Sequence, residues 1–82
     1  MIKIKDNVDL KELEKYGFTI VFYWYKKEIK FYDTGISYYV NKDTKQIQIA
    51  TYEGYDTYLD NTLYDLIKDD LVEKVEEWEY LI

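Results

Sequence analysis

Few residue types that perform covalent catalysis occur in this chain of 82 residues. The sequence contains no His and no Cys, and Ser37 is its only serine. A serine nucleophile needs a neighbouring base to take its proton, and imidazole is the usual one. The three glycines, Gly17, Gly35 and Gly54, are isolated and not gathered in a loop that could hold a phosphate. The sequence therefore predicts neither nucleophilic catalysis nor a glycine-rich loop that holds a phosphate.

Carboxylates are abundant, with 17 Asp and Glu residues. Paired carboxylates can act as general acid and base in glycoside hydrolysis, and oxygen ligands can bind Ca²⁺. A calcium loop places its ligands at alternate positions around a central Gly, whereas the acidic stretch 56–70 is irregularly spaced and contains no Gly. We expect a solvated acidic face here, with no catalytic residues, no metal site and no cofactor. The chain is accordingly predicted not to be an enzyme.

The charges are divided unevenly between the two parts of the chain. All 11 basic residues are lysines, and the formal net charge is −6. Residues 1–52 carry a balance of +2, whereas residues 53–82 carry a balance of −8. Such segregation is typical of an interaction surface, and it also keeps a small domain soluble.

An acidic C-terminal surface is the first functional hypothesis. Displayed on a helix and its neighbours, these carboxylates would imitate the phosphates of a duplex and attract a protein with a basic groove. The predicted partner is a host protein, in particular a basic nucleic-acid-binding protein. The predicted contact residues are Asp65, Asp69, Asp70, Glu73, Glu76 and Glu77.

Tyrosine supplies the second hypothesis, because the chain contains 11 of them. Five are predicted to share the wetter face of a β-sheet: Tyr23, Tyr25, Tyr32, Tyr39 and Tyr52. Tyrosine is enriched in interfaces, so this face could cover a partner or a second copy of the chain in a homodimer, as in a self-associating structural or virion-accessory module. Stacking on nucleic-acid bases is a third possibility, which the net charge of −6 disfavours. An AT-rich genome would also produce a tyrosine excess without any function.

The length fits a single domain spanning residues 1–82. No apolar run approaches the length of a membrane span, and no apolar signal segment is recognisable, so we expect a cytoplasmic protein that does not contact a membrane. The run 18–25 is β-branched or aromatic throughout and predicts a strand, which the Lys-Lys-Glu stretch 26–28 interrupts. Further strands are expected at 29–32, 36–40 and 46–52. Their short connections suit an antiparallel meander.

Alternation along these strands assigns two faces to the predicted sheet. The core face consists of Phe18, Ile20, Phe22, Trp24, Ile29, Phe31, Ile36, Tyr38, Val40, Ile47 and Ile49. The wetter face carries the five tyrosines together with Thr19, Val21, Lys30, Ser37, Gln46, Gln48 and Ala50.

Helical signals flank this meander. Asp9 followed by Glu12 resembles a capping box, and Gly17 suits a left-handed stop, so a helix is expected over 9–16. A second helix is expected over 62–69, where the adjacent aspartates 69 and 70 disfavour continuation. The tail is then either more helix or a strand at 71–75, and residues 2–5 suit an edge strand. The predicted fold is α+β: an antiparallel four-stranded meander, with five or six strands if the ends join, and two short helices packed on one face.

The segment Thr62-Leu63-Tyr64-Asp65-Leu66-Ile67-Lys68-Asp69-Asp70-Leu71-Val72-Glu73-Lys74-Val75 follows a tyrosine-rich meander and a short Lys-Glu-Leu helix. This arrangement resembles small uncharacterised proteins encoded by phages and prophages of low-GC Gram-positive bacteria. The resemblance implies a cytoplasmic accessory protein that binds and disables a host factor. That group carries no assigned catalytic residues to transfer.

Overall fold

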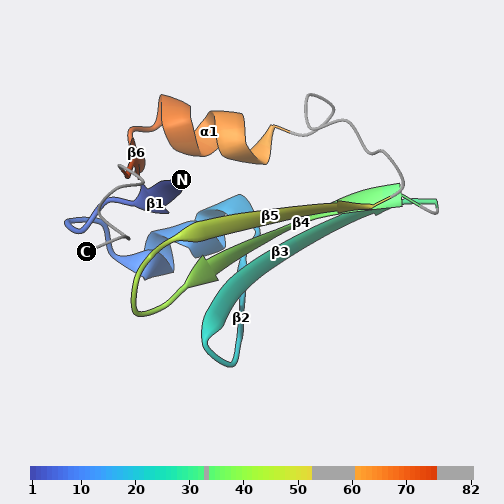
Figure 1. Cartoon of the computed structure of the whole chain (residues 1–82), viewed down its shortest axis with the longest axis horizontal. Helices are drawn as coiled ribbons and strands as arrows, with labels where there is room; N and C mark the ends of the chain where they lie inside the picture. Colours follow the sequence, from blue (N-terminus) through green and yellow to red (C-terminus); the bar gives the residue numbers. More distant parts are fainter. Residues whose placement is uncertain (33, 53–60, 76–82) are drawn as a thin grey trace.

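A computed structural model describes residues 1–32, 34–52 and 61–75 (Figure 1). In chain order their elements are β1 (Ile2–Ile4), the 3₁₀-helix η1 (Leu10–Tyr16), β2 (Thr19–Val21), β3 (Trp24–Phe31), β4 (Thr34–Asn41), β5 (Ile47–Tyr52), α1 (Thr62–Lys68) and β6 (Val72–Lys74). The class is α+β, as the sequence predicts, with an antiparallel four-stranded sheet and two short helices.

The four-stranded sheet is a simple meander with the order β2-β3-β4-β5. Each strand pairs antiparallel with the next, and β3 and β4 pair along eight residues. Two-residue connections link β2 to β3 and β3 to β4, which fixes the register of both hairpins. The sheet is strongly twisted, and the two turns lie at opposite ends of β3 (Figure 1).

The first turn lies at a different place from the one that the sequence predicts. The chain reverses at Phe22 and Tyr23, inside the run 18–25, and β3 continues through the Lys-Lys-Glu stretch 26–28. Pairing with β4 over eight residues outweighs the local β-propensity of the run, because such propensity depends on context. Lys26 and Glu28 are tolerated within β3 because they share the sheet face opposite to the one that η1 and α1 cover.

This displaced turn changes the face of the residues that follow it. Tyr25 pairs with Val40 and is buried, with 6% of its surface exposed, so its assignment to the wetter face was wrong. Trp24 pairs with Val21 and lies on the opposite face, so its assignment to the core was also wrong. Ile20 and Phe22 were expected in the core and are exposed instead.

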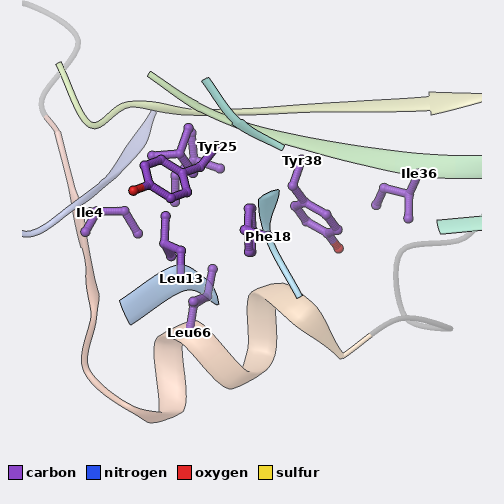
Figure 2. Close-up of a cluster of buried hydrophobic side chains, with 9 residues drawn as sticks. Ile4, Leu13, Phe18, Tyr25, Ile36, Tyr38 and Leu66 are labelled. Carbon is purple, nitrogen blue, oxygen red and sulfur yellow. The ribbon is translucent and has the colours of Figure 1, made fainter. Parts of the chain in front are cut away.

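The core lies between the sheet and the two helices. Its side chains converge from β1, η1, the residue before β2, strands β3 to β5 and α1, and Figure 2 shows most of them. The buried apolar set is Ile4, Leu13, Phe18, Tyr25, Ile36, Tyr38, Val40, Ile47 and Leu66. Each helix contributes one fully buried leucine, Leu13 from η1 and Leu66 from α1. Burying such a side chain contributes about 1.5–3 kcal/mol, so these two residues hold the helices to the sheet.

Capping residues define both ends of η1 as predicted. The Asp9 side chain accepts a hydrogen bond from the amide of Lys11 (3.0 Å), which satisfies one otherwise free helical donor. Gly17 ends the helix with φ 93°, a conformation that side chains disfavour. At α1 the N-cap is Asn61 and Thr62 is the first helical residue, buried inside.

The predicted break after α1 is confirmed. Asp69 caps the helix, Asp70 has φ 61°, and the chain continues as strand β6. β6 pairs antiparallel with β1 in a separate two-stranded sheet, and a bridge between Lys3 and Gln46 connects this sheet to the meander. Of the two alternatives for the tail, the strand holds for residues 72–74, while residues 76–82 lie outside the described structure.

Lys45 joins the turn after β4 to the N-terminal segment. Its ammonium donates hydrogen bonds to three backbone carbonyls, those of Lys5 (3.3 Å), Asp6 (3.0 Å) and Val8 (2.7 Å). Its own carbonyl accepts from the amide of Ile4 (2.8 Å). The Lys45 ammonium thus supplies hydrogen bonds that water would otherwise make to the backbone carbonyls between β1 and η1.

Candidate protein-binding surface

The β2–β3 hairpin ends in four consecutive apolar or aromatic residues, Ile20, Val21, Phe22 and Tyr23, which we call the hairpin tip. Their exposed fractions are 53%, 39%, 86% and 74%. Two belong to the short edge strand β2 and two form the turn. The turn points away from α1 and the β1–β6 sheet (Figure 1). Contiguous exposed apolar side chains on a small domain mark a contact surface.

The backbone of the hairpin tip is held in place from the neighbouring turn. The amide of Lys42, which follows β4, donates a 3.0 Å hydrogen bond to the carbonyl of Tyr23. The ammonium of Lys42 also lies 6.0 Å from the ring centroid of Tyr25, at a distance suited to a cation–π interaction. Phe22 adopts φ 54°, which is unusual for a bulky residue. The tip is therefore a preformed loop with its aromatic side chains turned outward.

Aromatic rings and charged groups contact one another in sequence from the hairpin tip along the sheet face opposite to η1 and α1. Trp24 meets Tyr39 edge to face, with ring centroids 5.9 Å apart. The ammonium of Lys26 lies 5.5 Å from the centroid of the Tyr39 ring and 3.8 Å from the carboxylate of Glu28. These contacts order the side chains on this face and leave it amphipathic.

The carboxylate of Glu28 is contacted by several polar groups on that face. Lys30 lies 3.6 Å from it, and the buried hydroxyl of Ser37 donates a 3.3 Å hydrogen bond to it. Ser37, the single serine of the chain, thus serves as a partner of Glu28 on the neighbouring strand.

The five tyrosines predicted to form one face do not do so. Tyr25 is buried in the core, whereas Tyr39 lies on the opposite sheet face. Tyr23 belongs to the hairpin tip, and Tyr32, 90% exposed, lies in the turn at the other end of β3. Tyr52 occupies the last position of β5, opposite Gly35. The turn at residues 22 and 23 separates Tyr23 and Tyr25 from the group that alternation predicts, and the turn after β3 separates Tyr32 from it.

Three of the four predicted acidic residues within the described structure interact with the N-terminal part of the chain. Asp70 forms a 2.6 Å ion pair with Lys5, and Glu73 lies 3.9 Å from Lys3. Asp69 accepts a 2.5 Å hydrogen bond from the hydroxyl of Tyr16. Asp65 is exposed on α1, and Glu76 and Glu77 lie outside the described residues.

These contacts change the electrostatics of the acidic segment. The Lys5 and Lys3 ammonium groups offset the charges of two carboxylates, because β1 and β6 are adjacent strands. The neighbouring lysines 68 and 74 add two further positive charges. The described part of the segment, residues 61–75, therefore docks onto β1 and η1 through its acids.

Two ionisable groups show the effect of such contacts on proton affinity. The hydrogen bond to Asp69, more than partial burial or the nearby negative charges, raises the pKa of Tyr16 to about 12. The hydrogen bond from Lys3 and the charge of its ammonium lower the pKa of Asp6. The Tyr16 hydroxyl connects two distant segments of the chain, whereas the Asp6 carboxylate binds a lysine of its own segment.

The described residues were also compared with the requirements of a metal site and of a membrane-spanning helix, and they meet neither. Within residues 1–32, 34–52 and 61–75, no three acidic side chains lie close enough together to hold a metal ion. No helix in the same residues is long and apolar enough to cross a membrane. Comparison of the chain with protein-family models, curated proteins and solved structures finds no significant match.

The residues that are most exposed on this surface are not recognisable as surface residues from the sequence. Ile20 and Phe22 were placed in the core because they alternate in phase with Phe18. The turn at Phe22 and Tyr23 contains none of the Gly, Asn or Asp residues that usually mark a two-residue hairpin. One signal was present: a strand of eight β-branched or aromatic residues is long for the edge of an 82-residue domain.

Proposed function

We propose that this chain is a non-enzymatic protein-binding module that uses the hairpin tip as its contact surface. The observation that carries the proposal is the exposure of four consecutive large apolar side chains, Ile20–Tyr23, on a turn fixed by Lys42. Aromatic side chains presented on a rigid turn bind at low entropic cost, because few rotamers must be frozen.

The surroundings of the tip indicate the chemistry of the partner. Lys26 and Lys42 flank the exposed aromatic residues, and both approach aromatic rings of the sheet. A complementary protein surface would offer an apolar pocket for Phe22 with carboxylates at its rim. Following the resemblance to phage accessory proteins, we propose that this partner is a host protein.

An acidic contact surface is the second form of the proposal. The net charge of −6 supports it, since it would steer the chain towards a basic nucleic-acid-binding protein. The ion pairs of Asp70 with Lys5 and of Glu73 with Lys3 weaken it. The hairpin tip is therefore the preferred surface, and the two forms predict different sensitive residues.

Site-specific photocrosslinking distinguishes them. A photoreactive phenylalanine derivative at position 22 should form a covalent adduct with a host protein in cells, and unlabelled wild-type chain should suppress that adduct. The matched control places the same group at Tyr64, an exposed aromatic residue of α1. Adducts from position 64 but not from position 22 would refute the hairpin-tip proposal and favour the α1 side, where Asp65 lies. Adducts with lipid alone would assign the tip to a membrane instead.

A further inference from the structure

The outer edge of the meander beside β2 is only partly occupied. β2 has three residues and β3 has eight, and their pairing ends where Thr19 meets Lys26. Within the described residues, no strand pairs with positions 27–31 on that side of β3. In Figure 1 this stretch forms the lower border of the sheet, to the right of β2. An unpaired strand edge is a template for another strand.

The register of the hairpins determines which backbone groups this edge presents. Val21 and Trp24 close a two-residue turn, and residues along a strand direct their N–H and C=O groups alternately to the two sides. Trp24 and Lys26 therefore face β2, and the 3.4 Å hydrogen bond from the Thr19 hydroxyl to the Lys26 carbonyl agrees with this direction. By the same alternation, Glu28 and Lys30 direct their backbone groups to the free edge.

We propose that a second copy of the chain pairs with this edge, so that β3 lies antiparallel to the partner's β3 about a two-fold axis at Ile29. In this register Glu28 lies opposite the partner's Lys30, and Lys30 lies opposite the partner's Glu28. These two pairs would form about four backbone hydrogen bonds between the chains. The five unpaired positions of one copy match the five of the other.

Charge favours this register over the neighbouring ones. In an antiparallel pair, edge-facing residues must oppose edge-facing residues, so the register shifts only in steps of two. A shift in one direction places Glu28 opposite the partner's Glu28, and a shift in the other places Lys30 opposite the partner's Lys30. Like charges directly opposite each other destabilise a strand pair, whereas opposite charges stabilise it. Only the register centred on Ile29 pairs unlike charges on both sides of the axis.

The remaining geometry is compatible with this dimer. The partner's β3 would end with its Phe31 opposite Lys27, one position before the Lys26 that pairs with Thr19 of β2. The two Ile29 side chains would meet on the sheet face that the helices cover, because directly opposed residues share a face. The two hairpin tips would then lie roughly 40 Å apart, at about 3.3 Å per strand residue. The dimer does not depend on the proposed function of the tip, so either proposal can fail alone.

Charge exchange in the β3 edge tests the proposal. Sedimentation velocity over a range of concentrations should show a dimer for the wild-type chain. Glu28→Lys and Lys30→Glu should each weaken dimerisation at least tenfold, because each creates two like-charged pairs. The double variant should restore the dissociation constant to within about threefold of wild type, since it exchanges the two charges without losing their complementarity. Circular dichroism checks that each variant remains folded.

Matched controls change the same charges elsewhere. Glu14→Lys and Lys11→Glu alter exposed residues of η1 and should leave dimerisation unchanged. Amide hydrogen exchange gives an independent readout: protection of the Glu28 and Lys30 amides should rise with concentration, while the Ile29 amide, which faces β4, stays protected throughout. A wild-type chain that is monomeric at every concentration overturns the proposal. So does a double variant as weak as either single one.

Discussion

The hydroxyl of Tyr16 donates a 2.5 Å hydrogen bond to the carboxylate of Asp69, although 53 residues separate them in the chain. Tyr16 is the last residue of η1, and Asp69 caps α1. This bond therefore ties the ends of the two helices that cover the sheet. It also gives an acidic residue of the C-terminal segment a structural role.

Replacing this tyrosine tests how much the bond contributes. Tyr16→Phe should lower the free energy of unfolding by about 1 kcal/mol, because it removes a charge-assisted hydrogen bond at a partly exposed site. Urea denaturation measures the change. Tyr64→Phe, at an exposed tyrosine of α1, is the matched control and should have almost no effect. Equal stability of the Tyr16 variant and wild type would show that the bond contributes nothing.

The same bond predicts a loss of stability at alkaline pH. The folded-state pKa of Tyr16 is raised from 10.0 to about 12, so the folded chain holds this proton more tightly than the unfolded chain does. The resulting stabilisation is complete below pH 10 and is lost as the pH rises towards 12. Thermal melting between pH 8 and 12 measures it. In the Tyr16→Phe variant this part of the decline should be absent.

We predict that Phe22 lowers the stability of the fold but is needed for partner binding. Its φ of 54° is costly for a side chain with a Cβ, and Gly adopts it freely. Phe22→Gly should raise the free energy of unfolding by about 1 kcal/mol, as measured in urea. The same variant should lose partner binding in competition with the photocrosslinking chain. Tyr23→Gly is the control: its φ is not positive, so we expect no gain in stability.

Gly35 is required because a side chain would not fit at this position, and not because of its backbone dihedral angles. A Cβ at this position would lie 2.6 Å from the carbonyl oxygen of Ile29 on the adjacent strand. That oxygen belongs to the backbone, so β3 and β4 would have to separate. Gly35→Ala should therefore cost about 2 kcal/mol in free energy of unfolding. A variant as stable as wild type would indicate that the β3–β4 hairpin has more room than the structure shows.

We predict that the ammonium of Lys45 contributes more to the free energy of unfolding than the ammonium of an exposed lysine does. Lys45→Met keeps much of the side-chain volume and leaves the carbonyls of Lys5, Asp6 and Val8 without this donor. We expect a loss of about 2 kcal/mol in free energy of unfolding, measured by chemical denaturation. Lys11→Met, at an exposed lysine of η1, should change stability by less than about 0.5 kcal/mol.

Local signals were sufficient to predict most elements of this protein. Asp9 and Gly17 bound η1 because caps act through hydrogen bonds and dihedral angles of the adjacent residues. The aspartates at 69 and 70 end α1, and the short strands that follow one another form a meander. These features depend on residues close together in the chain, which is why composition and spacing are enough to predict the α+β class.

Tertiary contacts alone decided which residues are exposed on the surface and which of its charges are paired. The turn at Phe22 and Tyr23 results from the eight-residue pairing of β3 with β4, and it moves Tyr25 into the core and Phe22 into solvent. Pairing of β1 with β6 likewise brings Lys5 to Asp70 and offsets a charge that the sequence alone leaves free. Which residues meet across strands depends on contacts distant in the chain. Burial and charge pairing follow from those contacts, so no local pattern can determine them.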